Sequence, residues 1–389
     1  MNLKEKIQQL ATQYFNDVVA LRRAIHENPE LAYEEIQTAA LVCTELDKLN
    51  IPYTKNIAKT GVVAILKCNN PEKKCIALRA DMDALPITEA KELPYKSKHE
   101  GKMHACGHDV HTANLLGVAK ILSALRNEIE GTYKFIFQPS EEKVPSGAAA
   151  MIEAGVLENP KPDLILGLHV SPEIEVGKLG FRSGAFMASS DEIYFKVIGK
   201  GGHAARPQDI INPLYTTSKI LLAFENDTDL NKPMVLSFGK IEAKGATNIV
   251  PDFVLVEGTL RCFNETLRIE MQQHIKTTAE KIAAENNCVC EVNILQGYPV
   301  LVNNDSVTQK AQTLTDEYIG SENVLDLPIR MGAEDFAFYT HHVPACFYRL
   351  GVGNKQKNIS AGLHAANFNV DEDALRISIG NMAWMAINL

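Results

Sequence analysis

Two short segments of this chain bring together the side chains that bind divalent transition metals. The first is CGHDVH at residues 106–111, and the second is the doubled carboxylate Glu141-Glu142. Thiolate, imidazole and carboxylate groups are the protein ligands of zinc and of its first-row neighbours. When one of two adjacent carboxylates binds a metal, the other is free to transfer a proton, so these segments predict a two-metal hydrolase.

The residues around both segments indicate how these side chains are positioned. We expect Cys106 and His108 to alternate on an extended segment, in which the glycine between them lets both turn towards one point. Glu141-Glu142 come soon after the apolar run YKFIF at 133–137, which is typical of a buried strand. The paired carboxylates are therefore predicted at the end of a strand.

The composition is that of a globular enzyme with more than one domain. A length of 389 residues exceeds a typical single core, which predicts two domains. The 46% hydrophobic and 22% charged content is ordinary for globular proteins, and the net charge of −9 argues against nucleic acid or an anionic membrane as a partner. No apolar run reaches the ~18 residues of a membrane span, and the N-terminal segment resembles a charged amphipathic helix rather than a signal peptide. We therefore expect a cytoplasmic protein.

The eight cysteines are scattered along the chain without the spacing of a disulfide framework. In a cytoplasmic protein they are expected to be free thiols. Cys288 and Cys290 alternate within CVCEVNI, which favours a strand that buries both thiols over a second metal site.

Strands and helices alternate in the two outer parts of the chain, and this order predicts a layered α/β domain. Helices are expected at 3–27, 34–49, 111–125 and 146–157, and strands at 61–67, 75–81, 133–139 and 163–170. The middle of the chain has a β-α-β-β-α-β order between residues 191 and 295, the pattern of a ferredoxin-like domain. The predicted domains are a larger one made of residues 1–181 and 296–389, and an inserted one made of residues 182–295.

Nine short motifs follow one another between residues 22 and 368. They are RRAIHENPELAYEE, ALRADMDALPI, MHACGHDVHTANLLG, FQPSEE, GLHV, GKGGHAARP, TNIVPD, GAEDFAFY and LHAANF. In this order they resemble the aminoacylase/carboxypeptidase family of metallohydrolases. The amidohydrolase branch, with hippurate hydrolase, plant auxin-conjugate hydrolases and N-acetyl-diaminopimelate deacetylase, is the most similar. The resemblance implies a di-metal exopeptidase-like catalytic domain, in which helices flank a mixed sheet, and an inserted ferredoxin-like domain for lid and dimer functions.

The resemblance implies two divalent cations per subunit, held by five side chains: Cys106, His108, Glu142, His169 and His364. His169 ends the predicted strand DLILGLH at the carboxyl edge of the sheet, where α/β proteins place their sites, and His364 lies in a turn after a glycine. Most of the wider family has an aspartate where this chain has the bridging Cys106. A thiolate favours zinc, while the other ligands also suit manganese; nickel and cobalt are further alternatives.

For catalysis the resemblance implies that Glu141 is the general base, which accepts a proton from the metal-bound water and passes it to the leaving amine. The alternative for Glu141 is a contact that orients a histidine ligand. His203, in GKGGHAARP, is implied to stabilise the scissile carbonyl oxygen from the same or the partner subunit, and its alternative is a loop histidine. Asp81 is implied to orient a metal ligand, although the histidine two residues before it in the wider family is Arg79 here. His111 is expected to be structural.

Three residues are implied to contact the substrate, each with a structural alternative. Asn248 resembles a substrate-binding asparagine but could cap a turn, and Arg261 could pair with a substrate carboxylate or face solvent on its strand. Glu334 borders the site in the family and could position substrate or His364, or it could complement a helix dipole. Asp83 is left between a role at the site and a role in a turn.

The predicted reaction is metal-dependent hydrolysis of the amide bond of an N-acyl amino acid, a small-molecule substrate. Small peptides, as substrates of a dipeptidase or carboxypeptidase, and N-acetyl-diaminopimelate are alternatives that the motifs do not separate. A catalytically silent binding protein is the alternative of a different class, and the presence of Glu141 with all five implied ligands opposes it. The resemblance also implies a homodimer formed through the inserted domain.

Overall fold

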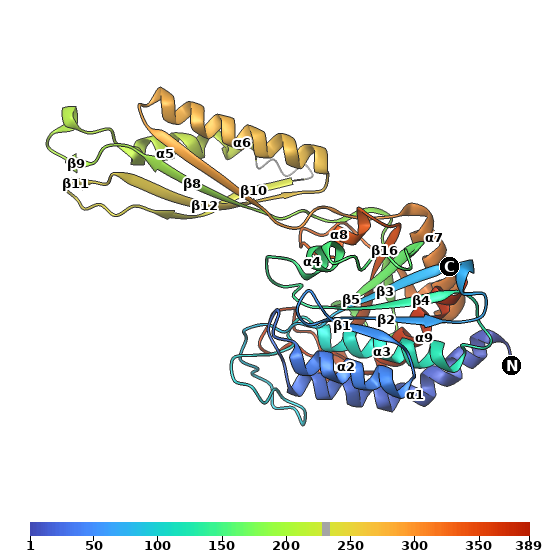
Figure 1. Cartoon of the computed structure of the whole chain (residues 1–389). Coiled ribbons are helices and arrows are strands. Elements are labelled where there is room, and N and C mark those ends of the chain that lie inside the picture. Colours follow the sequence, from blue (N-terminus) through green and yellow to red (C-terminus); the bar gives the residue numbers. More distant parts are fainter. Residues whose placement is uncertain (228–233) are drawn as a thin grey trace. The chain divides into compact units, whose positions relative to one another are not determined.

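The computed structural model describes residues 1–227 and 234–389, and these divide into two compact units (Figure 1). The first unit consists of Met1–Gly184, Val302–Pro328 and Asp335–Leu389. The second unit consists of Ala185–Leu301 and Ile329–Glu334, so the chain passes between the units more than once. Within the described residues, no helix is both long enough and apolar enough to span a membrane.

The first unit is built on an eight-stranded mixed sheet. In spatial order its strands are β1 (Tyr53–Ile57), β2 (Gly61–Lys67), β4 (Thr132–Gln138), β3 (Cys75–Asp81), β5 (Leu164–Glu175), β16 (Ala345–Gly353), β6 (Leu179–Phe181) and β15 (Val324–Asp326). The central strands β4, β3, β5 and β16 are parallel, while β1, β2 and β4 pair antiparallel. Every residue of β3 and β4 is buried, as is typical of parallel strands covered on both faces.

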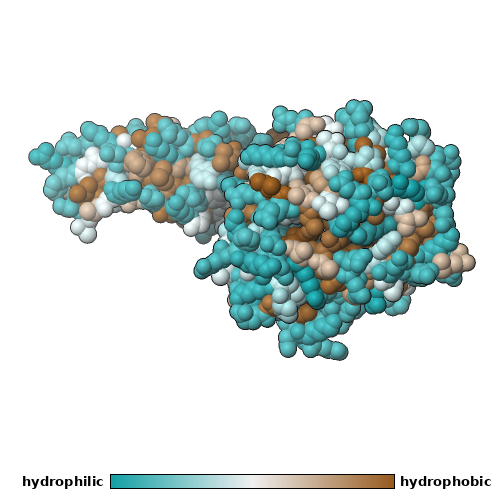
Figure 2. All heavy atoms as spheres, turned by 60° about the horizontal axis from the view of Figure 1, so that its bottom comes forward, coloured by the Kyte–Doolittle hydropathy of each residue, from teal (hydrophilic) through white to brown (hydrophobic). Residues whose placement is uncertain are grey.

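Helices cover both faces of this sheet (Figure 1). One face carries α1 (Leu3–Glu27), α2 (Ile36–Lys48), α3 (His108–Ala124) and α9 (Asp373–Asn388), with α7 (Asp305–Ile319) packed beside α9. The other face carries the short helices α4 (Gly147–Glu153) and α8 (Ala337–Thr340). This arrangement confirms the predicted α/β fold, in which helices flank a mixed sheet. Figure 2 shows that hydrophilic residues cover most of the visible surface, with hydrophobic residues in small groups between them.

The carboxyl ends of the central strands lie at one edge of the sheet. Asp81, the last residue of β3, pairs with Gln138, the last residue of β4, so the two following loops leave the sheet side by side. The prediction that His169 ends its strand is wrong, because β5 continues to Glu175. In the parallel pair of β3 and β5, Arg79 lies opposite Gly167. Asp81 and His169 each come two residues later, so they nevertheless lie level with each other.

The turn before α3 also differs from the prediction. Helix α3 begins at His108 rather than at residue 111, and Cys106 and His108 do not alternate on an extended segment. Gly107 between them has a φ of 87°, the left-handed conformation that glycine adopts readily. A Cβ atom at Gly107 would also come within 2.4 Å of Val170 Cγ2. Both constraints require glycine at this position, and the sharp turn directs the Cys106 and His108 side chains into one site.

The second unit is a four-stranded antiparallel sheet with two helices. In spatial order its strands are β10 (Met234–Glu242), β12 (Phe253–Cys262), β8 (Asp191–Ile198) and β13 (Val289–Gln296). The helices are α5 (Pro213–Ala223) and α6 (Glu265–Glu285), and Cys288 and Cys290 are buried in the apolar core of this unit. The β-α-β-β-α-β order and the strand pairing are those of a ferredoxin-like unit. At one end of it, β9 (Gly202–His203) and β11 (Ile249–Val250) form a two-stranded ribbon (Figure 1).

A buried ion pair joins α1 to the first turn of α3. Arg22 Nε lies 2.7 Å from Asp109 Oδ2, and His26 Nδ1 lies 2.7 Å from the same oxygen. All three side chains are fully buried. Burial alone would raise the pKa of Asp109, but Arg22 and His26 outweigh burial and hold that pKa well below its ordinary value.

We expect Asp109→Asn to lower the free energy of unfolding by about 3 kcal/mol, because it removes the nearer and fully buried partner of Arg22. The guanidinium then keeps only Glu372, 3.3 Å away, as a counter-charge. The depressed pKa means that the carboxylate stabilises the fold at neutral pH. The difference between wild type and variant should shrink as the pH falls below the unfolded-state value of about 4. Urea denaturation between pH 3 and pH 8 measures it, with Asp17→Asn at an exposed position of α1 as the control. Equal stability of wild type and Asp109→Asn at pH 7 would contradict the assignment.

Candidate metal centre

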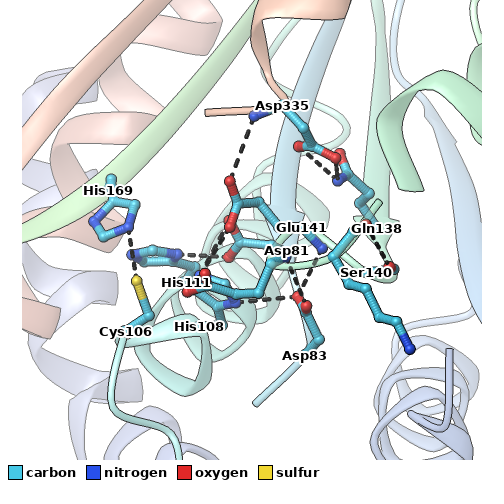
Figure 3. Close-up of polar contacts among 12 residues, drawn as sticks. Asp81, Asp83, Cys106, His108, His111, Gln138, Ser140, Glu141, His169 and Asp335 are labelled. Carbon is cyan, nitrogen blue, oxygen red and sulfur yellow. Dashed lines mark hydrogen bonds and ion pairs between the residues drawn. The ribbon is translucent and has the colours of Figure 1, made fainter. Parts of the chain in front are cut away.

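Two buried histidines direct a ring nitrogen towards Cys106. His108 Nδ1 lies 3.2 Å from Asp83 Oδ1, and His169 Nδ1 lies 2.7 Å from the Val170 carbonyl oxygen, to which it donates. These contacts leave the Nε2 atom of each ring available as a ligand. Cys106 Sγ lies 3.3 Å from His169 Nε2 (Figure 3). The contact that each histidine makes on its far side thus sets the orientation a metal would need.

The predicted ligands form two groups that share one sulfur atom. Cys106, His108 and His169 form the first group, and Cys106, Glu142 and His364 form the second. Within each group the ligand atoms lie within 4.8 Å of one another. His364 reaches the second group from a left-handed turn with a φ of 63°, and its Nε2 lies 3.1 Å from Glu142 Oε1. The structure therefore brings all five side chains together, and they could hold two cations on either side of the Cys106 thiolate.

The charge distribution at the site fits cations. His108 Nε2 is buried and has no hydrogen-bond partner among the described residues, although it faces Asp81 Oδ2 at 3.8 Å and Glu142 Oε1 at 3.9 Å. Burial opposes a charged His108, but the carboxylates of Asp81, Asp83 and Glu142 raise its pKa to about 10. Burial, followed by the nearby glutamates, raises the pKa of the Cys106 thiol well above its usual value. Without cations the site would hold these protons, and divalent metals would replace them as they bind.

Glu141 lies directly beside the two ligand groups. Its side chain is almost fully buried, and its Oε1 accepts a hydrogen bond from the Asp335 backbone N–H at 3.4 Å (Figure 3). Its Oε2 lies 4.0 Å from His108 Nε2, which is too far for a hydrogen bond. Asp83, rather than Glu141, contacts the far side of His108. This geometry favours proton transfer over the alternative in which Glu141 orients a histidine ligand.

Asp81 belongs to a buried polar network next to the ligands. Arg79 Nη1 donates to Asp81 Oδ2 at 2.6 Å, and Arg79 Nη2 donates to Asp335 Oδ1 at 2.7 Å. Asp81 Oδ1 lies 2.6 Å from His111 Nδ1, and His111 Nε2 accepts the Val170 backbone N–H at 3.0 Å. Both nitrogens of His111 are therefore engaged by protein groups, as expected for a structural residue. Asp81 holds His111 and Arg79, and it does not contact Nδ1 of His108.

Asp83 holds the loop that carries the paired glutamates. Its Oδ1 accepts the Glu141 backbone N–H and its Oδ2 accepts the Glu142 backbone N–H, both at 3.0 Å (Figure 3). Since Asp83 also contacts His108, one carboxylate connects a ligand from α3 with the two glutamates after β4. The sequence left Asp83 open, and the one available signal was its position two residues after Asp81 at the end of β3.

Asp335 is a further polar residue at the site, and no role there was predicted for it from the sequence. Its carboxylate accepts hydrogen bonds from Arg79, Gln138, the Ser146 hydroxyl and the Ala148 backbone N–H. It is fully buried, and burial raises its pKa to about 6 despite these donors. No local pattern indicates these partners, because they lie far from Asp335 in the sequence.

The other predicted site residues belong to the second unit, whereas all the side chains described above belong to the first. His203 in β9 and Asn248 just before β11 are both exposed. The two residues lie close together, because the Ala204 backbone N–H donates to the Asn248 carbonyl oxygen at 3.0 Å. Arg261 lies on β12, where it is opposite Val235 of β10, and its side chain makes no hydrogen bond or ion pair with any described residue. Glu334 ends the short segment Ile329–Glu334 of this unit.

Comparison with known proteins agrees with the fold and the site. The sequence profile of Peptidase family M20/M25/M40 matches residues 77–386. "IAA-amino acid hydrolase ILR1-like 4" of Arabidopsis thaliana is 38% identical over 381 residues, which cover 96% of this chain and 86% of the plant protein. "Thermostable carboxypeptidase 2" of Saccharolobus solfataricus is 36% identical over 394 residues, which cover 100% of this chain and 99% of that protein.

A solved structure extends the likeness to three dimensions. The crystal structure of a Bacillus subtilis protein, described as a dinuclear metal-binding peptidase of family M20, matches with a TM-score of 0.85 and 32% sequence identity. The match covers 97% of this chain and 98% of that one. The fold and the clustered ligands define a metal-dependent hydrolase of amide bonds. The chain belongs to Peptidase family M20/M25/M40.

Proposed function

We propose that this protein hydrolyses the amide bond of N-acyl amino acids in a reaction that depends on two divalent cations. The observation that carries the proposal is the pair of ligand groups that share Cys106, with Glu141 beside them. Cys106, His108 and His169 would hold one cation, and Cys106, Glu142 and His364 would hold the other. Zinc or manganese is the proposed metal, because the thiolate favours zinc and the other ligands also suit manganese; nickel and cobalt are alternatives.

The residues of the chain divide the chemistry among them. Bound divalent cations would lower the pKa of a coordinated water and polarise the substrate carbonyl. Glu141 accepts the proton of the attacking water and then delivers it to the departing amine nitrogen. Asp83 keeps Glu141, Glu142 and His108 in place, and Asp81 with Arg79 supports the same edge of the sheet.

The second unit supplies substrate contacts and acts as lid and dimerisation domain in this proposal. His203 donates to the carbonyl oxygen as negative charge develops there, from the same chain or from a partner chain. Asn248, adjacent to His203, contacts the substrate as well, and Arg261 pairs with the substrate carboxylate. Support comes from the exposure of His203 and Asn248 and from the Arg261 guanidinium, which pairs with no side chain in the described part of the protein. Glu334 is proposed to position substrate or His364.

The substrate class follows from what the relatives have in common. By name, the plant relative hydrolyses an amino acid conjugate and the archaeal relative is a carboxypeptidase. Both activities cleave an amide whose amine side is an amino acid. Peptides therefore remain the second candidate substrate, because the archaeal relative is similar over this whole chain.

Compartment and assembly are proposed on separate observations. All eight cysteines are free thiols, as is usual in the reducing cytoplasm. Tyr215, Leu222 and Ile269 of the second unit are each more than 60% exposed on the two helices of that unit. Such apolar side chains on the helices suit a homodimer interface through this unit.

Amine release from a panel of substrates tests the proposed function. The panel contains acetyl, benzoyl and indole-acyl amino acids, the matching carboxyl-blocked amides, and dipeptides, each with protein loaded separately with zinc, manganese, nickel or cobalt. We expect acyl amino acids with a free carboxylate to be cleaved faster than dipeptides or blocked amides. Glu141→Gln protein, purified in the same way, controls for contaminating hydrolases. Faster cleavage of dipeptides would favour the peptidase, and no cleavage by metal-loaded protein would contradict hydrolysis of this substrate class.

A further inference from the structure

The loop between β4 and α4 carries the paired glutamates in a conformation that needs support. Ser140, which directly precedes Glu141, has a φ of 50°, in the left-handed region that residues other than glycine seldom adopt. Its backbone cannot relax without moving both glutamates. External contacts must therefore hold this conformation.

A turn between α1 and α2 supplies such contacts at both ends of the loop. Glu35 Oε1 accepts the Ser140 backbone N–H at 2.9 Å, and the Tyr33 hydroxyl donates to the Pro145 carbonyl oxygen at 2.8 Å. Glu35 Oε1 also accepts the Tyr33 backbone N–H at 2.9 Å, and Glu35 Oε2 accepts the Thr60 hydroxyl at 2.5 Å. One short turn thus holds the first and the last residue of 140–145.

The contacts of the Glu35 side chain fit support of the loop and no direct role at the metal ligands. The side chain is fully buried, and burial raises the pKa of its carboxyl group. Burying a carboxylate costs free energy, and the hydrogen bonds from Tyr33, Thr60 and Ser140 offset that cost. Glu35 contacts no side chain of the two ligand groups. Asp83, by contrast, touches His108 as well as the loop, so a change at Asp83 would disturb a ligand directly.

We propose that Tyr33 and Glu35 are positioning residues of the hydrolytic reaction. They fix the backbone of 140–145, so that the Glu141 carboxylate meets the attacking water while Glu142 remains among the ligands. The inference rests on the proposed function, in which Glu141 is the base. Tyr33 and Glu35 precede the residues matched by the family profile, which begin at 77.

The chain contains a matched control for Glu35. Glu30 is also a buried carboxylate, and it likewise accepts backbone N–H groups and a threonine hydroxyl, from Gln37 and Thr38. These contacts begin α2 and do not involve residues 140–145. Glutamine has the shape of glutamate, but it replaces one carboxylate oxygen with an NH2 group. The N–H or O–H groups that donated to that oxygen then lose their acceptor. Glu35→Gln and Glu30→Gln therefore make equivalent local changes, and only the first affects the loop.

Steady-state kinetics and metal analysis of these two variants form the first test. We expect Glu35→Gln to lower kcat by about 10- to 100-fold, as small displacements of a reacting group do. KM and bound metal should stay within two-fold of wild type, and Glu30→Gln should keep its kcat. A similar loss of kcat in Glu30→Gln, or a loss of metal in Glu35→Gln, would overturn the proposal. If Glu35→Gln does not fold, Tyr33→Phe takes its place, with a ~3-fold fall in kcat expected on the same grounds.

A double-mutant cycle with Glu141→Gln is the second test. If Glu35 acts through Glu141, adding Glu35→Gln to Glu141→Gln should leave the residual rate unchanged. An equal fold loss in both backgrounds would place the effect of Glu35 elsewhere and overturn the positioning role. The single variant Glu141→Gln separates the two hypotheses, because near wild-type turnover there would contradict the proposed function itself.

Discussion

Glu141→Gln is expected to keep its bound metal and to lose about 10³- to 10⁴-fold in kcat, the upper range for removal of a general base. Glutamine has nearly the same volume and can still accept the hydrogen bond from the Asp335 backbone N–H. It cannot take a proton from the attacking water. The loss should therefore fall on kcat, with little change in KM.

The adjacent residue is a matched control for this prediction. Glu142 lies in the ligand group with Cys106 and His364, so Glu142→Gln should lose metal as well as activity. Metal content and kcat are measured on both variants under the same loading conditions. Near wild-type turnover by Glu141→Gln would show that Glu141 is not the proton carrier. Equal metal loss in the two variants would show that the roles of the neighbours are not separate.

Cys106→Ser is expected to weaken metal binding by at least ~100-fold, more than the loss typical of changes around a ligand. Cys106 is the one residue present in both ligand groups, so its removal should affect both cations. A serine hydroxyl remains protonated at neutral pH, whereas a cysteine gives up its proton to a bound metal. Activity should fall with the occupancy of the site.

Equilibrium dialysis against chelator-buffered zinc or manganese measures this effect. Cys68→Ser is the control, because Cys68 is a partly exposed free thiol that belongs to neither ligand group. The control should bind metal as the wild type does. Full occupancy of Cys106→Ser at the same free metal concentration would remove Cys106 from the ligand set.

Much of the fold could be predicted from local patterns. Helix α1 buries one face, which leaves apolar residues at helical spacing, and strand β4 is buried at every residue, which leaves a largely apolar run. Gly107 was expected to let Cys106 and His108 turn towards one point on an extended segment, but its left-handed φ and the start of α3 at His108 were not predicted. The length of β5 was also underestimated, because Glu175 pairs with Gly353 of a distant strand and its own neighbours do not indicate this.

The candidate site could also be predicted only in part. The side chains with metal-binding chemistry, Cys106, His108 and Glu142 among them, were evident from the sequence because their residue types and spacing are distinctive. The carboxylates that support them, Asp83, Glu35 and Asp335, were not. Asp83 and Glu35 accept mainly from backbone N–H groups, which every residue except proline has. Asp335 accepts mainly from side chains that lie far from it in the sequence. Residue types therefore determined what chemistry the protein can do. Only the tertiary structure decided how the site is held, because those hydrogen bonds join segments far apart in the chain.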